Sequence, residues 1–320
     1  MGSQSTALPQ NRRDFLKRCG LALGAPAVTS LLFSCQRGVG QDSHPSLVSS
    51  TQTTPGTPSL AEQRIVQEIV RQLEPLRVPG ASAAVINSYG VEWARGFGVL
   101  EMGNNAVVTE DTLFQAASIS KPVAAMAALK FVQDGKLTLS EDVNAKLQSW
   151  KIPENKFNRS RTITLTHLLS HTAGLTVPGF PGYAQGQPLP TLMQVLDGKP
   201  PANTPPIRVQ EPPGKQWRYS GGRYCVVQQL LTDTSERGVT ELLWKMVLDP
   251  LGMNLSTFEQ PLPSQKQRVA ASAHRHGDQP VPGKWHVYPE QAAAGLWTPL
   301  SISLDSALRS NGPMPESPAQ

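Results

Sequence analysis

A serine and a lysine three residues apart, at the head of a run of small residues, constrain this chain more than any other feature. Ser118 and Lys121 form the only Ser-x-x-Lys in the 320 residues. The alanine-rich residues 122–129 that follow favour a helix. On a helix, positions i and i+3 share a face, so the hydroxyl and the amine can meet. We therefore predict that Ser118 is a nucleophile whose proton is taken by a partly desolvated Lys121.

The residues around this pair resemble a known family. Residues 114–122, Phe-Gln-Ala-Ala-Ser-Ile-Ser-Lys-Pro, are similar to the nucleophile motif of serine β-lactamases and penicillin-binding proteins, particularly class C enzymes and their esterase relatives. Residues 163–175, 213–222 and 250–253 resemble later motifs of the family, in the same order. The resemblance implies an α/β fold of the α+β type, with an antiparallel sheet domain beside an all-α domain and the active site between them.

The resemblance also implies roles for single residues. It makes Ser118 the nucleophile and Lys121 the proton acceptor, while Ser120 is the competing hydroxyl. Tyr219 matches the tyrosine of the family's Tyr-x-Asn motif, which passes the proton to the leaving group, although an ordinary buried aromatic role remains the alternative. Position 221 is Gly instead of Asn, and the loss of that amide favours an esterase or peptidase over a β-lactamase. The family needs no cofactor and no metal.

The function expected from the family is a serine hydrolase that forms an acyl-enzyme on Ser118. Its substrates would be small esters, amides or lactams, or peptides derived from peptidoglycan. Two alternatives stay open: a catalytically inactive remnant, and a non-catalytic relative that binds the cell wall. A nucleic-acid partner is not indicated, because the net charge of +5 comes partly from the basic N-terminus and no basic stripe with interleaved aromatic residues follows.

The histidines and the cysteine of the central region have simpler interpretations. His167 and His171 are four residues apart, a spacing that can bind metal, but no H-E-x-x-H occurs and no third ligand is placed. The resemblance to the family implies that His171 is part of a structural helix end. The remaining histidines lie in a polar segment and are interpreted as solvated: His274, His276 and His286. Cys225 lies in an apolar stretch and is predicted to be a core residue.

Residues 1–35 are predicted to be an export signal. Residues 11–17, Asn-Arg-Arg-Asp-Phe-Leu-Lys, resemble a twin-arginine motif, and the apolar run behind them is too short to span a membrane. Cleavage at Ala25-Pro26-Ala27 and lipidation of Cys35 compete as processing routes. Residues 36–58, rich in Ser, Thr, Pro and Gly, favour a flexible tether. We expect a periplasmic or otherwise extracytoplasmic protein, anchored to the membrane if Cys35 is lipidated; the alternative is a cytosolic protein with a basic leader.

The tail departs from the family pattern after Thr298. Relatives continue with an Asp-Leu-Ala-Arg-Phe helix and later with a Lys-Thr-Gly or His-x-Gly strand, which donates one oxyanion-hole N–H. Codons allowed for residues 299–320 can be read in the neighbouring frame as Pro-Leu-Asp-Leu-Ala-Arg-Phe. We interpret this tail as frameshifted and expect the C-terminal strands to be missing; a divergent natural terminus is the alternative. Losing one oxyanion donor lowers the rate by about 10²–10³-fold.

Residues 59–298 are predicted to form the family domain. Ser59 and Glu62 suggest a capping box for a helix whose face carries Ile65, Ile69, Leu73 and Leu76. Two strands, residues 81–86 and 91–99, are expected to form a hairpin, and Gly135 is expected to end the nucleophile helix. Residues 222–231 and 239–249 are predicted to be amphipathic helices, between long proline-rich loops.

Overall fold

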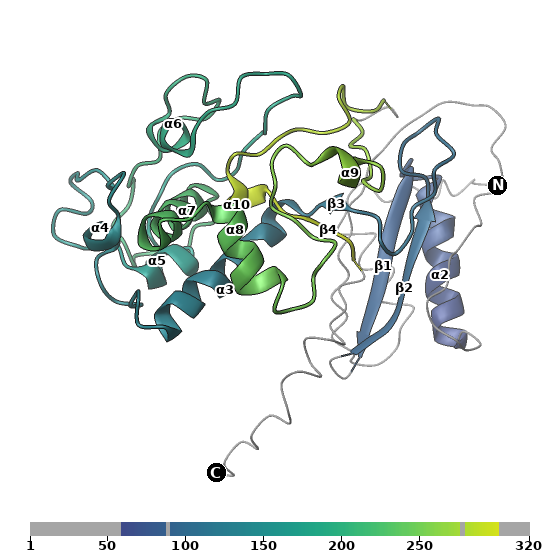
Figure 1. Cartoon of the computed structure of the whole chain (residues 1–320), viewed down its shortest axis with the longest axis horizontal. Coiled ribbons are helices and arrows are strands. Elements are labelled where there is room, and N and C mark those ends of the chain that lie inside the picture. The colour runs from purple at the N-terminus through teal and green to yellow at the C-terminus, as the bar shows by residue number, and fades with distance from the viewer. Residues whose placement is uncertain (1–58, 88–89, 276–278, 301–320) are drawn as a thin grey trace, which may run out of the picture.

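The computed structural model describes residues 59–300, apart from 88–89 and 276–278. The predicted export signal, the tether and almost all of the predicted frameshifted tail lie outside the described residues. Figure 1 shows a helix and a β-hairpin at one side of the molecule and a group of helices at the other, with a short strand pair between them. Among the described helices, none is both long and apolar enough to cross a membrane.

The first part of the fold is helix α2 (Leu60–Leu73) packed on the hairpin of β1 (Gly80–Asn87) and β2 (Gly90–Gly98). The apolar face predicted for α2 is confirmed, because Ile69 and Leu73 are buried against Trp93 and Phe97 of β2 in one cluster. Within the described residues, β1 pairs only with β2, and a second two-stranded sheet joins β3 to β4.

The predicted capping box of α2 is half right. The Ser59 hydroxyl accepts a hydrogen bond from the backbone N–H of Glu62 at 3.1 Å, as expected of an N-cap. The Glu62 carboxylate makes an ion pair with Arg95 of β2 at 2.6 Å, and both side chains are largely buried. Glu62 therefore ties the helix to the sheet, a contact that local sequence spacing does not encode.

The nucleophile segment begins with β3 (Phe114–Gln115), continues as the 3₁₀ turn η1 (Ala117–Ile119), and becomes helix α3 (Ser120–Gln133). The predicted end of α3 is confirmed: Asp134 is the C-cap and Gly135 has a φ of 70°, the left-handed conformation that glycine adopts without steric cost. Strand β3 pairs antiparallel with β4 (Trp297–Thr298), which the sequence patterns did not predict.

Most of the remaining helices form the second part of the fold. They are α4 (Val143–Lys146), α5 (Leu165–Leu169), α6 (Leu192–Asp197), α7 (Gly222–Ser235), α8 (Val239–Leu243), the π-helical turn η2 (Trp244–Leu248) and α10 (Gln291–Ala294). The short helix α9 (Ser264–Gln267) lies between this group and the hairpin (Figure 1). The prediction that α7 is amphipathic is wrong, because every residue from Gly222 to Leu231 is buried. A helix covered on all sides is the centre of a core, and α3, α4, α5, α6, α8 and α10 all pack against α7.

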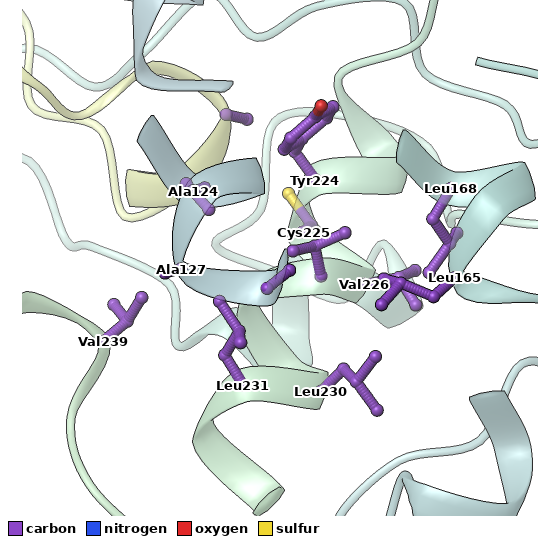
Figure 2. Packing of buried hydrophobic residues seen from close by; sticks show 14 of the residues in the cluster. Ala124, Ala127, Leu165, Leu168, Tyr224, Cys225, Val226, Leu230, Leu231 and Val239 are labelled. Atoms are coloured by element: carbon purple, nitrogen blue, oxygen red, sulfur yellow. The ribbon is translucent and has the colours of Figure 1, made fainter. Parts of the chain in front are cut away.

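Close packing between α3 and α7 places the nucleophile segment on a rigid base. Figure 2 shows Ala124 and Ala127 of α3 beside Cys225 and Leu231 of α7. Small side chains on α3 let the two backbones approach closely, which leaves little room for α3 to move. Cys225 is fully buried, as predicted for a core residue, and burial raises the pKa of its thiol well above the ordinary value.

Candidate active site

Ser118 and Lys121 meet at the start of α3. The Lys121 Nζ donates to Ser118 Oγ at 3.0 Å. Ser118 is exposed, whereas Lys121 is only 6% exposed. The preceding residue, Ala117, has a φ of 45°, in the left-handed region that non-glycine residues rarely adopt. Such backbone strain often accompanies functional sites, and here it lies directly before the predicted nucleophile.

Lys121 has a second partner on a distant segment. Its Nζ donates to the backbone carbonyl of Ala293 in α10 at 2.8 Å, in a buried contact. The site also lies next to β4, because the backbone N–H of Ala116 donates to the carbonyl of Leu296 at 2.9 Å. Ala293 is not among the residues predicted for the site, because it contributes a backbone carbonyl, which every residue has, and no side-chain motif marks it.

Ser120, the competing hydroxyl, has a different environment. It is fully buried, and its Oγ donates to the carbonyl of Ala117 at 2.6 Å. The same Oγ accepts from the backbone N–H of Leu296 at 2.9 Å. Ser120 therefore links the nucleophile turn to the segment before β4, and its hydroxyl faces no substrate.

Tyr219 lies beside the Ser118–Lys121 pair, where the resemblance to the family implied it would be. The Lys121 Nζ is 5.1 Å from the centre of the Tyr219 ring. Burial disfavours the phenolate, but hydrogen bonds with Lys121 and Ser118, together with the lysine charge, outweigh it and lower the pKa of Tyr219 below its ordinary value. Tyr219 is 38% exposed, so the alternative of an ordinary buried aromatic residue does not describe it.

Three rings extend this site outward. The His171 ring lies 4.5 Å from the Tyr219 ring and meets the exposed Trp217 edge-on at 6.0 Å. Burial, followed by the charges of Arg223 and Lys121, lowers the pKa of His171 to about 4. His171 is thus neutral at ordinary pH, and its Nδ1 accepts from the backbone N–H of Ser220 at 3.4 Å. The rings of His171, Trp217 and Tyr219 form an uncharged aromatic wall next to the nucleophile.

His167, His274 and His286 make separate structural contacts, and His276 lies outside the described residues. His167 caps α5, where its Nδ1 accepts from the backbone N–H of Thr164 at 3.2 Å. His171 follows the end of α5 with a φ of 62°, so the two imidazoles do not share a helical turn. The interpretation of His274 as solvated is wrong, because its Nε2 accepts from the backbone N–H of Met102 at 3.0 Å. His286 is exposed, and its Nδ1 lies 2.9 Å from the carbonyl of Pro181. In the part of the chain that the structure describes, no three potential metal-binding side chains cluster.

Comparison with known proteins decides the family. A family model described as Beta-lactamase matches residues 65–301. This chain belongs to the beta-lactamase family. Among curated relatives, Protein flp of Staphylococcus aureus (strain N315) is 24% identical over 227 residues, which are 70% of this chain and 43% of that protein. Esterase EstB of Burkholderia gladioli is 34% identical over 103 residues, 32% of this chain and 26% of the esterase. The matched part of this chain therefore spans less than half the length of each of these relatives.

Solved structures show the same fold. The octameric penicillin-binding protein homologue from Pyrococcus abyssi superposes with a TM-score of 0.60 at 23% identity, covering 77% of this chain and 55% of that chain. A beta-lactamase/D-alanine carboxypeptidase from Yersinia pestis gives 0.58 at 21% identity, covering 79% and 72%. EstCE1, a hydrolase with promiscuous acyltransferase activity, gives 0.59 at 22% identity, covering 76% and 70%. The predicted β-lactamase/transpeptidase-like fold class, with helices and antiparallel strands, is confirmed.

Steric crowding explains why position 221 is a glycine in this site. Its φ is −67°, so the backbone does not require glycine. A Cβ at position 221 would lie 2.8 Å from the Phe180 ring and 3.4 Å from the carbonyl of Pro178. Phe180 therefore occupies the space that an asparagine side chain would need at this position of the Tyr-x-Asn motif.

Proposed function

We propose that this beta-lactamase family chain is a serine hydrolase that acylates Ser118 with small ester substrates. The contact between Lys121 Nζ and Ser118 Oγ carries the proposal, because it joins an exposed hydroxyl to a buried amine at 3.0 Å. Once neutral, the amine can accept the hydroxyl proton over this distance.

The reaction follows in two steps. Ser118 Oγ attacks the substrate carbonyl and gives its proton to Lys121 Nζ. The Tyr219 hydroxyl gives its proton to the departing alcohol and regains one from Lys121, which becomes neutral again. Water then attacks the acyl carbonyl and gives a proton to Lys121, and this proton returns to Ser118 Oγ as the acid leaves. A tyrosine whose pKa is lowered suits the relay, because proton transfer is most effective when the pKa lies nearer the working pH.

The glycine at position 221 and the aromatic wall favour esters over amides and lactams as substrates. Without an asparagine amide at position 221, the site lacks a donor and acceptor for a substrate amide. The neutral rings of Trp217, Tyr219 and His171 present apolar faces to a bound group. The named esterase activity of EstB and the hydrolase activity of EstCE1 agree with this choice.

A covalent probe tests the proposal. A fluorophosphonate probe is expected to label the wild-type protein, and Ser118→Ala should abolish labelling because the attacking oxygen is gone. Lys121→Arg should lower the labelling rate by about 10²–10⁴-fold, since guanidinium cannot act as a base. The matched controls are Ser170→Ala and Lys130→Arg, both at exposed positions, and they should label like wild type.

Two outcomes contradict the proposal. A folded wild-type sample that is not labelled would favour the inactive or cell-wall-binding alternatives. Labelling that persists in Ser118→Ala would move the nucleophile elsewhere. The substrate classes are then ranked by how strongly p-nitrophenyl esters and a fluorescent penicillin each slow labelling by the fluorophosphonate probe. We expect the esters to slow labelling more.

A further inference from the structure

The Ala293 carbonyl, which accepts a hydrogen bond from Lys121, lies on a helix that is too short to be stable by itself. Helix α10 has only four residues, Gln291–Ala294, and so short a helix is unstable without tertiary contacts. Yet the carbonyl of Ala293 must stay 2.8 Å from Lys121 Nζ. Side chains from other elements must therefore fix α10.

Gln228 of α7 makes two hydrogen bonds to the start of α10 and to the residue before its N-cap. Its Nε2 donates to the carbonyl of Pro289 at 3.1 Å. Its Oε1 accepts from the backbone N–H of Ala292 at 3.0 Å. Gln228 is only 5% exposed, and the residue that follows Ala292 is Ala293 itself. The Gln228 amide therefore binds the backbone on both sides of Glu290 and Gln291, immediately before the Ala293 carbonyl that accepts from Lys121.

We propose that Gln228 is a positioning residue for catalysis, which holds the Ala293 carbonyl against Lys121 and thereby aims the amine at Ser118. The proposal rests on the serine hydrolase function proposed above. An amide suits the role because it carries a donor and an acceptor in fixed geometry, and the two backbone groups need one of each. A hydrocarbon side chain of the same length fills the space but makes neither bond.

Other contacts hold the first residue of α10 and the segment that follows the helix. The Gln291 side chain donates to Thr240 Oγ1 at 2.9 Å and to the carbonyl of Phe258 at 2.7 Å. The N–H of Leu296 donates to Ser120. These contacts keep the segment in place when Gln228 is changed, so the expected result is a shift of the Ala293 carbonyl rather than loss of the fold.

The neighbouring Gln229 provides a matched control. It has the same 5% exposure, but its Nε2 donates to Asp233 of its own helix at 2.8 Å. Asp233 also accepts from Ser149 Oγ and from the backbone N–H groups of Gln148 and Ser149. Gln229→Met therefore removes a buried amide of equal size without touching α10.

The experiment measures probe acylation as a function of probe concentration. Gln228→Met is expected to lower the maximal acylation rate by about 10–100-fold while half-saturation changes little, because a displacement of about 1 Å costs up to 10²-fold in rate. Gln229→Met should keep the wild-type maximal rate. In Gln228→Glu, a protonated carboxyl can both donate and accept, whereas a carboxylate cannot donate. The ratio of its rate to wild type should therefore fall as the pH rises from 5 to 8.

Hydrogen exchange of the segment around α10 separates this proposal from the proposed function. Gln228→Met should speed amide exchange in residues 289–296 and leave α3 unchanged. If wild type is not labelled but this exchange change appears, the hydrolase function fails and the structural contact stands. A folded Gln228→Met protein that acylates at the wild-type maximal rate overturns the positioning role. Equal loss in Gln228→Met and Gln229→Met would also overturn it, since general destabilisation of α7 would then explain both.

Discussion

Glu290 is a buried carboxyl at the N-cap of α10. It is fully buried, and neither of its side-chain oxygens has a hydrogen-bond partner among the described residues. Burial disfavours the carboxylate and raises the pKa of Glu290 to about 7. The side chain therefore stays protonated in the folded protein under conditions where an exposed glutamate is ionised.

This burial makes stability depend on pH with a defined sign. The folded-state pKa lies above the unfolded value of 4.5, so the contribution of Glu290 is complete below pH 4.5 and is lost as the pH rises to about 7. A shift of this size corresponds to a free energy on the order of 3 kcal/mol. We predict that Glu290→Gln is progressively more stable than wild type as the pH rises from 4.5 to 7. Urea unfolding at several pH values measures the free energy of unfolding of both proteins, and Glu236→Gln, at an exposed position, is the control. A difference between Glu290→Gln and wild type that stays constant with pH contradicts the prediction.

The site shows which residues sequence reasoning can find. Ser118, Lys121 and Tyr219 belong to short motifs with fixed spacing, and the structure brings these three together. Ala293 contacts Lys121 through its backbone carbonyl, and the Gln228 side chain binds the backbone of Pro289 and Ala292, so neither residue belongs to a sequence motif. His171 was assigned to a helix end and not to the aromatic wall, because its ring contacts come from residues 46 to 53 positions further along the chain: Trp217, Tyr219 and Tyr224.

Among the elements, those with local sequence signals were predicted correctly, whereas the pairing of strands far apart in the sequence was not predicted. Helix α2, the β1–β2 hairpin and the end of α3 follow from periodicity, turn residues and a C-cap glycine. Strands β3 and β4 have two residues each, and their residue pairs are 182 and 184 positions apart in the sequence, a separation that no local pattern reveals. The amphipathic prediction for α7 failed because its polar residues Gln228, Gln229 and Asp233 are satisfied inside the protein.

The cap of α2 gives a prediction at the scale of an element. Ser59→Ala removes the acceptor of the Glu62 N–H and is expected to lower the free energy of unfolding by about 1 kcal/mol. The proposed catalytic residues lie in the other part of the fold, so probe labelling of the folded variant should stay at the wild-type rate. Urea denaturation followed by circular dichroism measures the first effect, and Ser59→Asp, which keeps a capping oxygen, should restore stability. An unchanged midpoint in Ser59→Ala would show that the cap contributes nothing.

For the whole molecule, the proposal that the chain is exported rests on residues outside the described part. We predict that changing both Arg12 and Arg13 to Lys leaves the protein in the cytoplasm, because the twin-arginine motif is read by its receptor as an address. Cell fractionation and immunoblotting measure the distribution. Cys35→Ala, examined in parallel, should release the protein from the membrane fraction if a lipid is attached there. Export of the double variant at the wild-type level would contradict the twin-arginine assignment.

The contact between Lys121 and Ala293 spans 172 positions of sequence, and that between Ser120 and Leu296 spans 176. At a synthesis rate of about 5–20 residues per second, roughly 10–35 s separate the appearance of the lysine from that of its acceptor. During this interval the nascent chain already contains Ser118 and α3, yet the backbone that orients the amine has not been made. In the proposed hydrolase, Ser118 therefore lacks an oriented amine until nearly the whole described fold has been synthesised.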